Sequence, residues 1–322
     1  MILFENIFVS HAHIITLSNR SSESRPLSRY TEMIDRIKKK QGEIELLLEG
    51  VSHCLLEYWN RNRSAQQSGE SGLHVMTKED QTLVSTADYE SNALLKDGLS
   101  RLFPEVPICS EEDEEIKEVS KRDAYWLIDP LDGTARFLDG YDDFAILVAF
   151  ISSDGMAEAG WVVFPAKRLT FWAIDASCGV IGDAQGEVLS LSKRDAMKRE
   201  RVYLRWDAGE GKTEDNGSHG IPSGMKSIGL YSDESLHTGA AFLSLLTGAL
   251  DGVILQMGRL QEWDVGAPAA IIRALGGGVY GIDGKEFRFG TDEKHRVFMA
   301  SSRNFQRELL EIATTLWEES SL

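Results

Sequence analysis

The sequence predicts a layered fold of helices and sheets, of the α+β or α/β class, and three observations lead to this prediction. Apolar residues recur at helical spacing over 30–62. Short apolar runs separated by turn residues follow between 125 and 174. After residue 200, strand-like and helix-like segments alternate. With 322 residues, the chain is long enough to bury a sizeable core.

The first 29 residues are expected to form an N-terminal arm, disordered in part, that contributes little to function. The apolar stretch 1–16 is interrupted by charged and histidine residues and lacks the basic leading region of a signal peptide. The polar stretch 18–29 has the composition of a linker or a frayed arm. We therefore divide the rest of the chain into an N-terminal half, 30–185, and a C-terminal half, 186–322.

Two helices are predicted before the apolar runs begin. The first covers 30–62 with a kink near Gly42, and a polar loop follows it over 63–81. The second covers 86–103 and ends at Pro104, because proline cannot continue a helix.

The remaining elements are predicted from the period of apolar residues and from turn signals. The runs between 125 and 174 indicate an antiparallel meander of the strands Tyr125–Ile128, Phe144–Ile151, Gly160–Phe164 and Leu169–Ile174. The C-terminal half is expected to contain strands over 201–206, 227–231 and 251–257 and helices over 236–250 and 265–278.

The composition restricts the partners of the protein. The 51 acidic and 34 basic residues leave a formal net charge of -17, which would repel a nucleic-acid backbone. No apolar run approaches the roughly 20 residues that a membrane helix needs. Three cysteines without paired spacing suit a reducing, cytoplasmic location. An anionic ligand would have to be attracted by something other than overall charge, and metal ions are the obvious candidate.

The segment WLIDPLDGTARF, residues 126–137, places two carboxylates after an apolar strand. Pro130 is expected to end the strand, and a tight reversal after it would let Asp129 and Asp132 converge. The carbonyl of Leu131 lies between them, and oxygen ligands of this kind suit Mg2+. The structural alternative is a surface turn with a helix cap.

Gly133 and Thr134 follow these carboxylates directly. Gly133 allows the backbone to approach a ligand closely. Thr134 is expected to open a short helix whose free amide groups favour a phosphate oxygen. A phosphate site beside the carboxylates is therefore predicted.

Three further segments offer acidic residues that would complete such a site. CSEEDEE supplies Glu111 or Glu112. VSTAD places Asp88 at a helix start, and QEWDVGAPAA places Asp264 just before a helix. A solvated loop, a favourable charge at a helix N-terminus and an N-cap are the structural alternatives. Five carboxylates meeting without cations would repel one another and become partly protonated, whereas bound Mg2+ removes this penalty.

The motifs VSTAD, EED, DPLDGT and WDVGA, in this order, resemble those of the inositol monophosphatase superfamily of Mg2+-dependent phosphatases. The resemblance covers residues 73–302. It implies an α+β fold of the sugar-phosphatase type, in which helices and sheets alternate in the order αβαβα. It also implies an enzyme that acts on a small phosphate ester and, because members often form dimers, a homodimer.

The resemblance further implies which residues bind the metal ions. Glu111, Asp129 and the carbonyl of Leu131 would hold a first Mg2+ ion. Asp129, Asp132 and Asp264 would hold a second. Two or three ions are implied in all.

The same resemblance implies the catalytic residues. Asp88 would pair with Thr134 to orient and deprotonate the attacking water, and the amides of Gly133 and Thr134 would receive the phosphate. The implied reaction is in-line attack of a metal-activated water on phosphorus, without a covalent phosphoenzyme. Inhibition by lithium is implied as well.

Two motifs bear on which phosphate ester is the substrate. KEDQTLVSTAD, residues 78–88, and WDVGAP are similar to motifs of 3'(2'),5'-bisphosphate nucleotidases and of inositol polyphosphate 1-phosphatases. Inositol monophosphatases use a glutamate in the span between Asp251 and Trp263 to grip the inositol hydroxyls. After Asp251 this span has no acidic residue until Glu262, and Gln256 is the nearest match. DGTARF departs from the DGTKEF type that is frequent in nucleotidases, and HTGAAF departs from the usual small-residue turn around the leaving group.

The candidate substrate-binding residues are Arg136, His237, Thr238, Gly239 and Gln256. The leading hypothesis is a 3'(2'),5'-bisphosphate nucleotidase that hydrolyses adenosine 3',5'-bisphosphate to AMP. The alternatives are an inositol monophosphatase or inositol polyphosphate 1-phosphatase and, in another class, a family member that binds a phosphate ligand or metal without turnover. The pair Asp88 and Thr134 argues against a pure binding protein, which needs no water-activating couple.

Overall fold

The computed structural model describes residues 13–16, 27–68, 75–77, 83–113, 123–182, 201–205, 229–231, 238–256, 260–290, 297–302 and 305–320. The helices in these ranges are α1 (Leu27–Lys39), α2 (Gln41–Ser68), α3 (Thr86–Leu102), α4 (Thr134–Leu138), α5 (Thr238–Leu246), α6 (Glu262–Ala274) and α7 (Gln306–Ser320). Within the described residues, no helix has the length and apolar composition needed to span a membrane.

The larger sheet has seven described strands in the order β1-β9-β8-β7-β6-β5-β4. Its strands are β1 (His13–Thr16), β4 (Ile108–Ser110), β5 (Tyr125–Asp132), β6 (Ala145–Ile151), β7 (Ala157–Phe164), β8 (Leu169–Ile174) and β9 (Ser177–Gly182). Neighbouring strands from β5 to β9 are antiparallel, so the predicted meander is confirmed. β4 joins β5 in parallel, which makes the sheet mixed.

The second sheet has five described strands in the order β11-β10-β12-β14-β13. Its strands are β10 (Arg201–Arg205), β11 (Gly229–Tyr231), β12 (Gly252–Gln256), β13 (Gly277–Tyr280) and β14 (Val297–Ser302). β10 pairs in parallel with both β11 and β12, whereas β14 is antiparallel to β12 and β13. A separate antiparallel pair consists of β2 (Val75–Thr77) and β3 (Leu83–Ser85).

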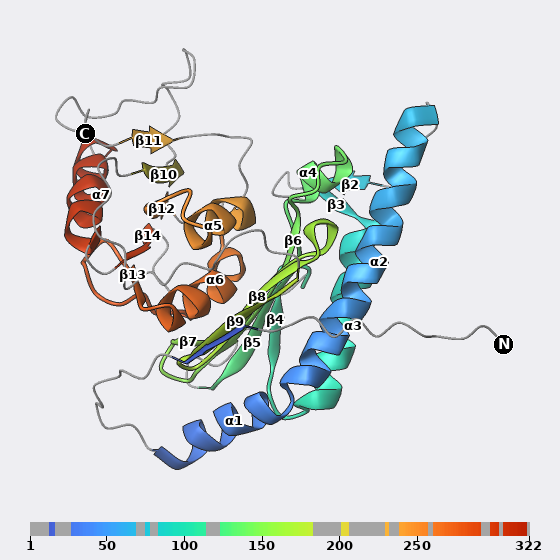
Figure 1. Ribbon diagram of the computed structural model, residues 1–322, viewed down its shortest axis with the longest axis horizontal. Coiled ribbons are helices and arrows are strands. Elements are labelled where there is room, and N and C mark those ends of the chain that lie inside the picture. Colours follow the sequence, from blue (N-terminus) through green and yellow to red (C-terminus); the bar gives the residue numbers. More distant parts are fainter. Residues whose placement is uncertain are drawn as a thin grey trace.

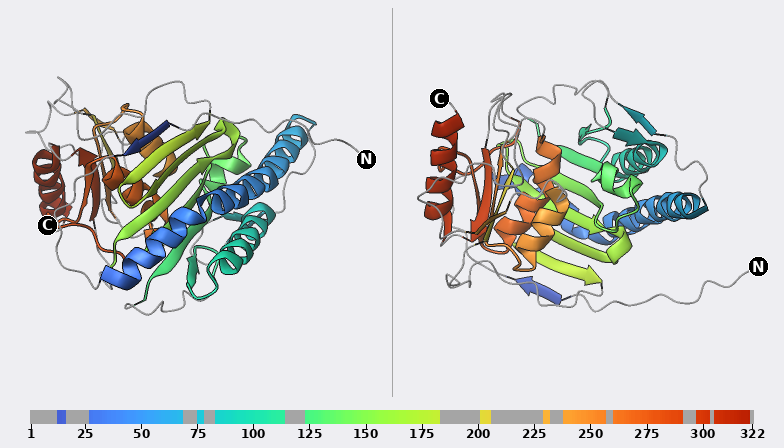
Figure 2. Two further views of the ribbon diagram at one scale, coloured as in Figure 1. Left: turned by 60° about the horizontal axis from the view of Figure 1, so that its bottom comes forward. Right: turned by 90° about the horizontal axis from the view of Figure 1, so that it is seen from above.

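Helices and sheets alternate in five layers (Figure 1). Helices α1 to α3 cover one face of the larger sheet, where Ile37, Leu55 and Leu99 share a buried cluster with Trp126 and Val148 of the strands. Figure 2 shows α1 and α2, in blue, across this face, with the red α7 at the far side of the molecule. Helices α5 and α6 lie between the two sheets, and α7 covers the outer face of the smaller sheet. The predicted αβαβα order is therefore confirmed.

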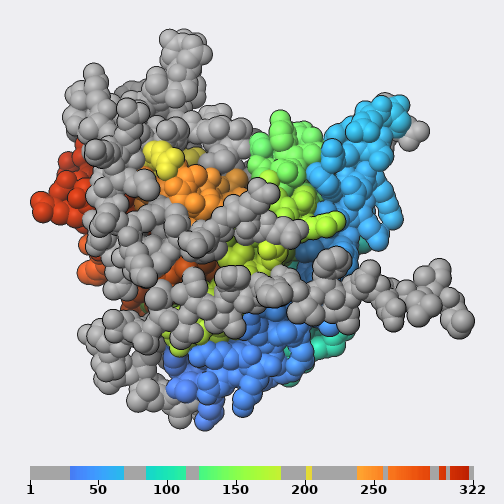
Figure 3. Space-filling model, viewed as in Figure 1, coloured from blue at the N-terminus to red at the C-terminus, as the bar shows by residue number. Residues whose placement is uncertain are grey.

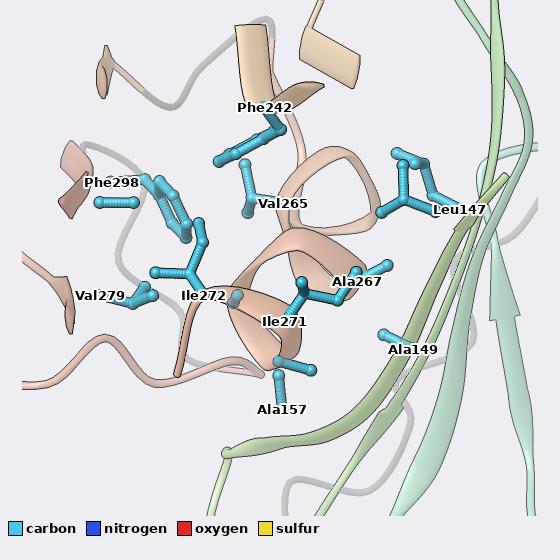
Figure 4. Close-up of a cluster of buried hydrophobic side chains, with 14 of the residues drawn as sticks. Leu147, Ala149, Ala157, Phe242, Val265, Ala267, Ile271, Ile272, Val279 and Phe298 are labelled. Atoms are coloured by element: carbon cyan, nitrogen blue, oxygen red, sulfur yellow. The ribbon is translucent and has the colours of Figure 1, made fainter. Parts of the chain in front are cut away.

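Helix α6 is the centre of the molecule because both of its faces are buried. Ala267 and Ile271 point toward the larger sheet, where Ala149 lies (Figure 4). Ile272 points the other way, toward Val279 of the smaller sheet. Because α6 packs against both sheets, their positions determine where its N-terminus, and with it Asp264, lies.

The last turns of α2 hold α4 in place. The side-chain amides of Asn62 and Gln66 each donate to the carbonyl of Leu138 at 2.6 Å, and the indole N–H of Trp59 donates to the carbonyl of Tyr141 at 2.9 Å. The carbonyl of Leu138 at the end of α4, and that of Tyr141 just after the helix, thus obtain side-chain partners. Figure 3 shows α2, in blue, next to the green segment that contains α4.

Several element boundaries differ from the prediction. Helix α2 continues to Ser68, where a polar loop was predicted over 63–81, because its last turns are anchored on α4. The predicted break near Gly42 is confirmed and falls at Lys40, two residues earlier. Four residues of the predicted N-terminal arm form the edge strand β1, which pairs with β9.

Candidate metal and catalytic site

The end of β5 carries two of the predicted metal ligands, and its backbone differs from the prediction. The strand does not end at Pro130 but runs to Asp132. Asp129 lies opposite Leu147 of β6, and Asp132 lies opposite Ala145. The three residue steps from Asp129 to Asp132 in β5 therefore lie opposite only two residue steps in β6. This extra residue is a β-bulge. Because Pro130 lies within the bulge, its missing N–H interrupts no regular ladder bond.

The bulge explains how both aspartates reach one site. Successive residues of a regular strand point to opposite faces, so Asp129 and Asp132, three residues apart, would point in opposite directions. One extra residue in the strand returns them to the same side. The N–H of Leu131 donates to Oδ1 of Asp129 at 3.0 Å and holds that side chain within the bulge. The predicted tight reversal is wrong, but the two carboxylates do meet.

Asp264 joins this pair from the C-terminal half. One carboxylate oxygen from each of Asp129, Asp132 and Asp264 lies within 4.8 Å of the other two. Asp264 is the third residue of α6, rather than preceding the helix as predicted, and its Oδ2 accepts the N–H of Gln261 at 2.7 Å. The first two aspartates are buried and Asp264 is half-buried. A hard cation such as Mg2+ would find three carboxylate ligands here.

Glu111 adds a fourth carboxylate. Its N–H donates to the carbonyl of Ile128 at 3.2 Å, which continues the parallel pairing of β4 and β5, and its side chain hydrogen-bonds to Asp129. Burial, followed by the negative charges of Glu111, Asp132 and Asp264, raises the pKa of Asp129 well above its usual range. A divalent cation would neutralise this concentration of charge, so the residues fit a metal centre.

Asp88 and Thr134 form the predicted pair. Oγ1 of Thr134 donates to Oδ1 of Asp88 at 2.9 Å and lies 3.2 Å from the carbonyl of Leu131. Oδ2 of Asp88 accepts two hydrogen bonds from Ser85, the N-cap of α3, at 2.8 Å from the N–H and 2.6 Å from the hydroxyl. Burial raises the pKa of Asp88, and the hydrogen bonds from Ser85 and Thr134 oppose this increase.

Gly133 turns the chain from β5 into α4. Its φ of 85° and ψ of 39° lie in the left-handed region, which glycine adopts at no steric cost. Gly133 is the N-cap of α4, so the first amide groups of this helix have no partner within it. The turn thus places the N–H groups of Gly133 and Thr134, which were predicted to bind phosphate, directly after Asp132.

Helix α5 also reaches the carboxylate cluster. The N–H of Gly239 donates to Oδ2 of Asp132 at 2.7 Å, and both groups are buried. Gly239 was predicted as a substrate contact, and the structure shows that its N–H donates to a predicted metal ligand. Sequence reasoning missed this bond because it joins residues 107 positions apart. Thr238, the neighbouring candidate, is buried in the first turn of the same helix.

The other candidate substrate residues are less closely tied to the cluster. Nε of Arg136 lies 2.9 and 2.8 Å from the two carboxylate oxygens of Asp143, and its guanidinium lies 4.0 Å from the ring centroid of Tyr141. Gln256 is half-buried at the end of β12. His237 lies outside the described residues.

Comparison with known proteins identifies the family. A sequence profile of the inositol monophosphatase family matches residues 40–320. The chain belongs to the inositol monophosphatase family. It is a metal-dependent phosphomonoesterase of this family, whose members use Mg2+. The family resemblance and the α+β fold predicted from the sequence are confirmed.

Individual members of the family are similar over most of their length. The 3'(2'),5'-bisphosphate nucleotidase CysQ of Escherichia coli K12 is 27% identical over 228 residues, which cover 67% of this chain and 83% of that protein. The IMPase of Thermotoga maritima has a similar structure, with a TM-score of 0.61, 24% identity and coverage of 91% and 100%. An IMPase/NADP phosphatase complexed with Mg2+ and phosphate gives a TM-score of 0.61, 15% identity and coverage of 87% and 95%. The two structures support the fold.

Proposed function

We propose that this member of the inositol monophosphatase family is a 3'(2'),5'-bisphosphate nucleotidase that hydrolyses adenosine 3',5'-bisphosphate to AMP. The similarity to CysQ over two thirds of the chain supports this substrate. KEDQTLVSTAD and WDVGAP, which resemble nucleotidase motifs, support it as well. The observation that carries the proposal of hydrolysis is the carboxylate cluster of Asp129, Asp132 and Asp264, together with the pair of Asp88 and Thr134.

The acidic cluster would hold two or three Mg2+ ions. Glu111, Asp129 and the Leu131 carbonyl would form one set of ligands, and Asp129, Asp132 and Asp264 would form another. Bound Mg2+ supplies a Lewis acid that activates water and stabilises charge on the leaving oxygen. The protein carries a net charge of -17, so a polyanionic substrate requires a local positive potential of this kind.

Thr134 and Asp88 would accept the proton of the attacking water. The Thr134 hydroxyl donates its hydrogen to Asp88, so a lone pair on Oγ1 is free to accept a hydrogen from water. A proton that moves from water to Thr134, while the Thr134 proton moves to Asp88, leaves hydroxide to attack phosphorus. The raised pKa makes Asp88 a stronger base than an exposed aspartate. The N–H groups of Gly133 and Thr134 would hold phosphate oxygens.

One residue favours a nucleotide substrate over an inositol monophosphate. Gln256, at the end of β12, is an uncharged amide and is the nearest match in this segment to the glutamate with which inositol monophosphatases hold inositol hydroxyls. The family resemblance adds two expectations, inhibition by lithium and a homodimer, and the spacing of the three cysteines favours a cytoplasmic location.

A phosphate-release assay tests the substrate directly. The purified protein with Mg2+ is given adenosine 3',5'-bisphosphate, inositol 1-phosphate or inositol 1,4-bisphosphate. We expect kcat/KM for the nucleotide to be higher by about tenfold or more, which corresponds to ~1.4 kcal/mol of additional transition-state stabilisation. The reverse ranking would overturn the nucleotidase assignment.

A further inference from the structure

The two oxygens of the Asp88 carboxylate have different partners. Oδ1 accepts the hydroxyl of Thr134, while Oδ2 accepts both the N–H and the hydroxyl of Ser85. Asp88 and Ser85 are each only 1% exposed. Two donors on one oxygen fix the rotation of the carboxylate, because any turn of the group would break at least one of three short hydrogen bonds.

Besides its hydrogen bond to Asp88, the Ser85 hydroxyl has a structural role at the start of α3. Its oxygen accepts the N–H of Ala87 at 3.2 Å, as expected of an N-cap at the start of α3. The hydrogen of the same hydroxyl points to Asp88. Ser85 therefore caps the helix through its oxygen and orients Asp88 through its hydrogen.

We propose that Ser85 is a positioning residue for water activation, which holds Oδ2 of Asp88 so that Oδ1 faces Thr134. This inference rests on the proposed role of the Asp88 and Thr134 pair. Without the hydroxyl, Oδ2 of Asp88 loses one of its two hydrogen bonds from Ser85, and the carboxylate can rotate away from Thr134. Because the site is buried, no bulk water replaces the missing donor. Misplacement of a catalytic group by about 1 Å can reduce the rate by about a hundredfold.

Ser85→Gly is the most informative variant. Glycine is nearly as good an N-cap as serine, so α3 keeps its start while Asp88 loses the hydroxyl. Ser85→Thr keeps a hydroxyl at this position. Ser91→Ala is the matched control, because buried Ser91 lies one turn along α3 and donates to the backbone carbonyl of Asp88 at 3.0 Å without touching the carboxylate.

The experiment measures kcat and KM of the full-length variants with saturating Mg2+, on whichever phosphate ester the wild type hydrolyses fastest, together with thermal unfolding. We expect Ser85→Gly to lower kcat about 10- to 100-fold with KM within about threefold, because the lost orientation acts in the transition state. Ser85→Thr should recover most of kcat. Ser91→Ala should lower the melting temperature but leave kcat within about twofold of wild type.

Asp88→Asn, measured in parallel, distinguishes a failure of the proposed water activation from a failure of the positioning role of Ser85. If Asp88→Asn retains full activity, the proposed water activation fails. If Asp88→Asn is inactive and Ser85→Gly keeps wild-type kcat, only the positioning role of Ser85 is overturned. A parallel loss of kcat in Ser85→Gly and Ser91→Ala would also overturn it, because a general weakening of α3 would then explain both.

Discussion

At the scale of single residues, the site depends on an irregular position in a strand. Asp129 and Asp132 are three residues apart and reach the same side only because β5 contains one extra residue opposite β6. The motif DPLDGT is thus a bulge followed by a left-handed glycine, and not a turn. Pro130 is tolerated in this otherwise buried strand for the same reason.

Asp129→Asn should separate stability from activity. The substitution removes one of four neighbouring carboxylates, so the metal-free variant should be as stable as the wild type or more stable. Its phosphatase activity should fall about a thousandfold or more, since several kcal/mol of metal-dependent stabilisation are lost. Thermal unfolding with and without Mg2+ measures the metal effect, and exposed Asp123→Asn is the control. A Mg2+-induced rise in Tm equal to that of the wild type would contradict Asp129 as a ligand.

Asp88 should make the stability of the metal-free protein depend on pH. Its pKa in the folded protein is raised above the unfolded value of ~3.9. The folded state therefore holds this proton more tightly, so the contribution to stability is complete below the unfolded pKa and is lost as pH rises through the folded pKa. The free energy of unfolding of the wild type, relative to Asp88→Asn, should fall as the pH rises above about 4. Urea unfolding in a chelator measures this difference, and a constant or rising difference would show that the shift is absent.

The acidic residues of the site could be predicted from the sequence, whereas their supporting contacts could not. Asp129 and Asp132 stand in one short motif, and Asp88 and Asp264 each stand near a helix start. The bond from Gly239 to Asp132 depends on how α5 packs against β5, which no local pattern contains. Ser85 is different, because a serine three residues before an acidic residue is the capping-box pattern and was available in STAD.

At the scale of elements, α6 lies so close to β7 that their backbones nearly touch. A Cβ atom placed on Gly160 of β7 would lie 2.6 Å from the carbonyl oxygen of Ala267 in α6. No side chain fits between the strand and the helix at this point, and Gly160 therefore sets the distance of α6 from the larger sheet. Since α6 carries Asp264 in its first turn, this distance also places a candidate metal ligand.

Gly160→Ala is expected to affect both stability and metal binding. The added methyl group would push α6 away from β7, which should cost about 1–3 kcal/mol of unfolding free energy and weaken Mg2+ binding. Gly50→Ala in α2 is the control, because its Cβ would meet nothing within 4 Å and alanine favours a helix by about 1 kcal/mol. Urea unfolding and a Mg2+ titration measure the two effects. Equal behaviour of the two variants would contradict the role assigned to Gly160.

Among the elements, the meander and α3 could be predicted, whereas β2, β3 and the last turns of α2 could not. The meander and α3 agree with the sequence because their apolar residues repeat over many positions. The strands β2 and β3 have three residues each, too few for a period to be visible. The last turns of α2 were predicted as a loop because their sequence is polar, and their helical state depends on contacts with α4.

At the scale of the whole molecule, the layered stack brings distant segments to one point. Asp88 comes from α3 on one face of the larger sheet, Asp129 and Asp132 from the sheet itself, and Asp264 from α6 on its other face. The alternation of helix-like and strand-like segments in the sequence does not distinguish an α+β from an α/β fold, because it does not show which strands pair. The family resemblance removed this ambiguity, and the mixed sheets show the α+β arrangement.

The proposed activity depends on divalent cations at the junction of these layers. The most direct test is a crystal soaked in Mn2+, a stand-in for Mg2+ whose anomalous scattering identifies it. We expect an anomalous peak among the carboxylates of Asp129, Asp132 and Asp264. Absence of a peak there, in crystals of enzyme that releases phosphate in the presence of Mn2+, would contradict the account.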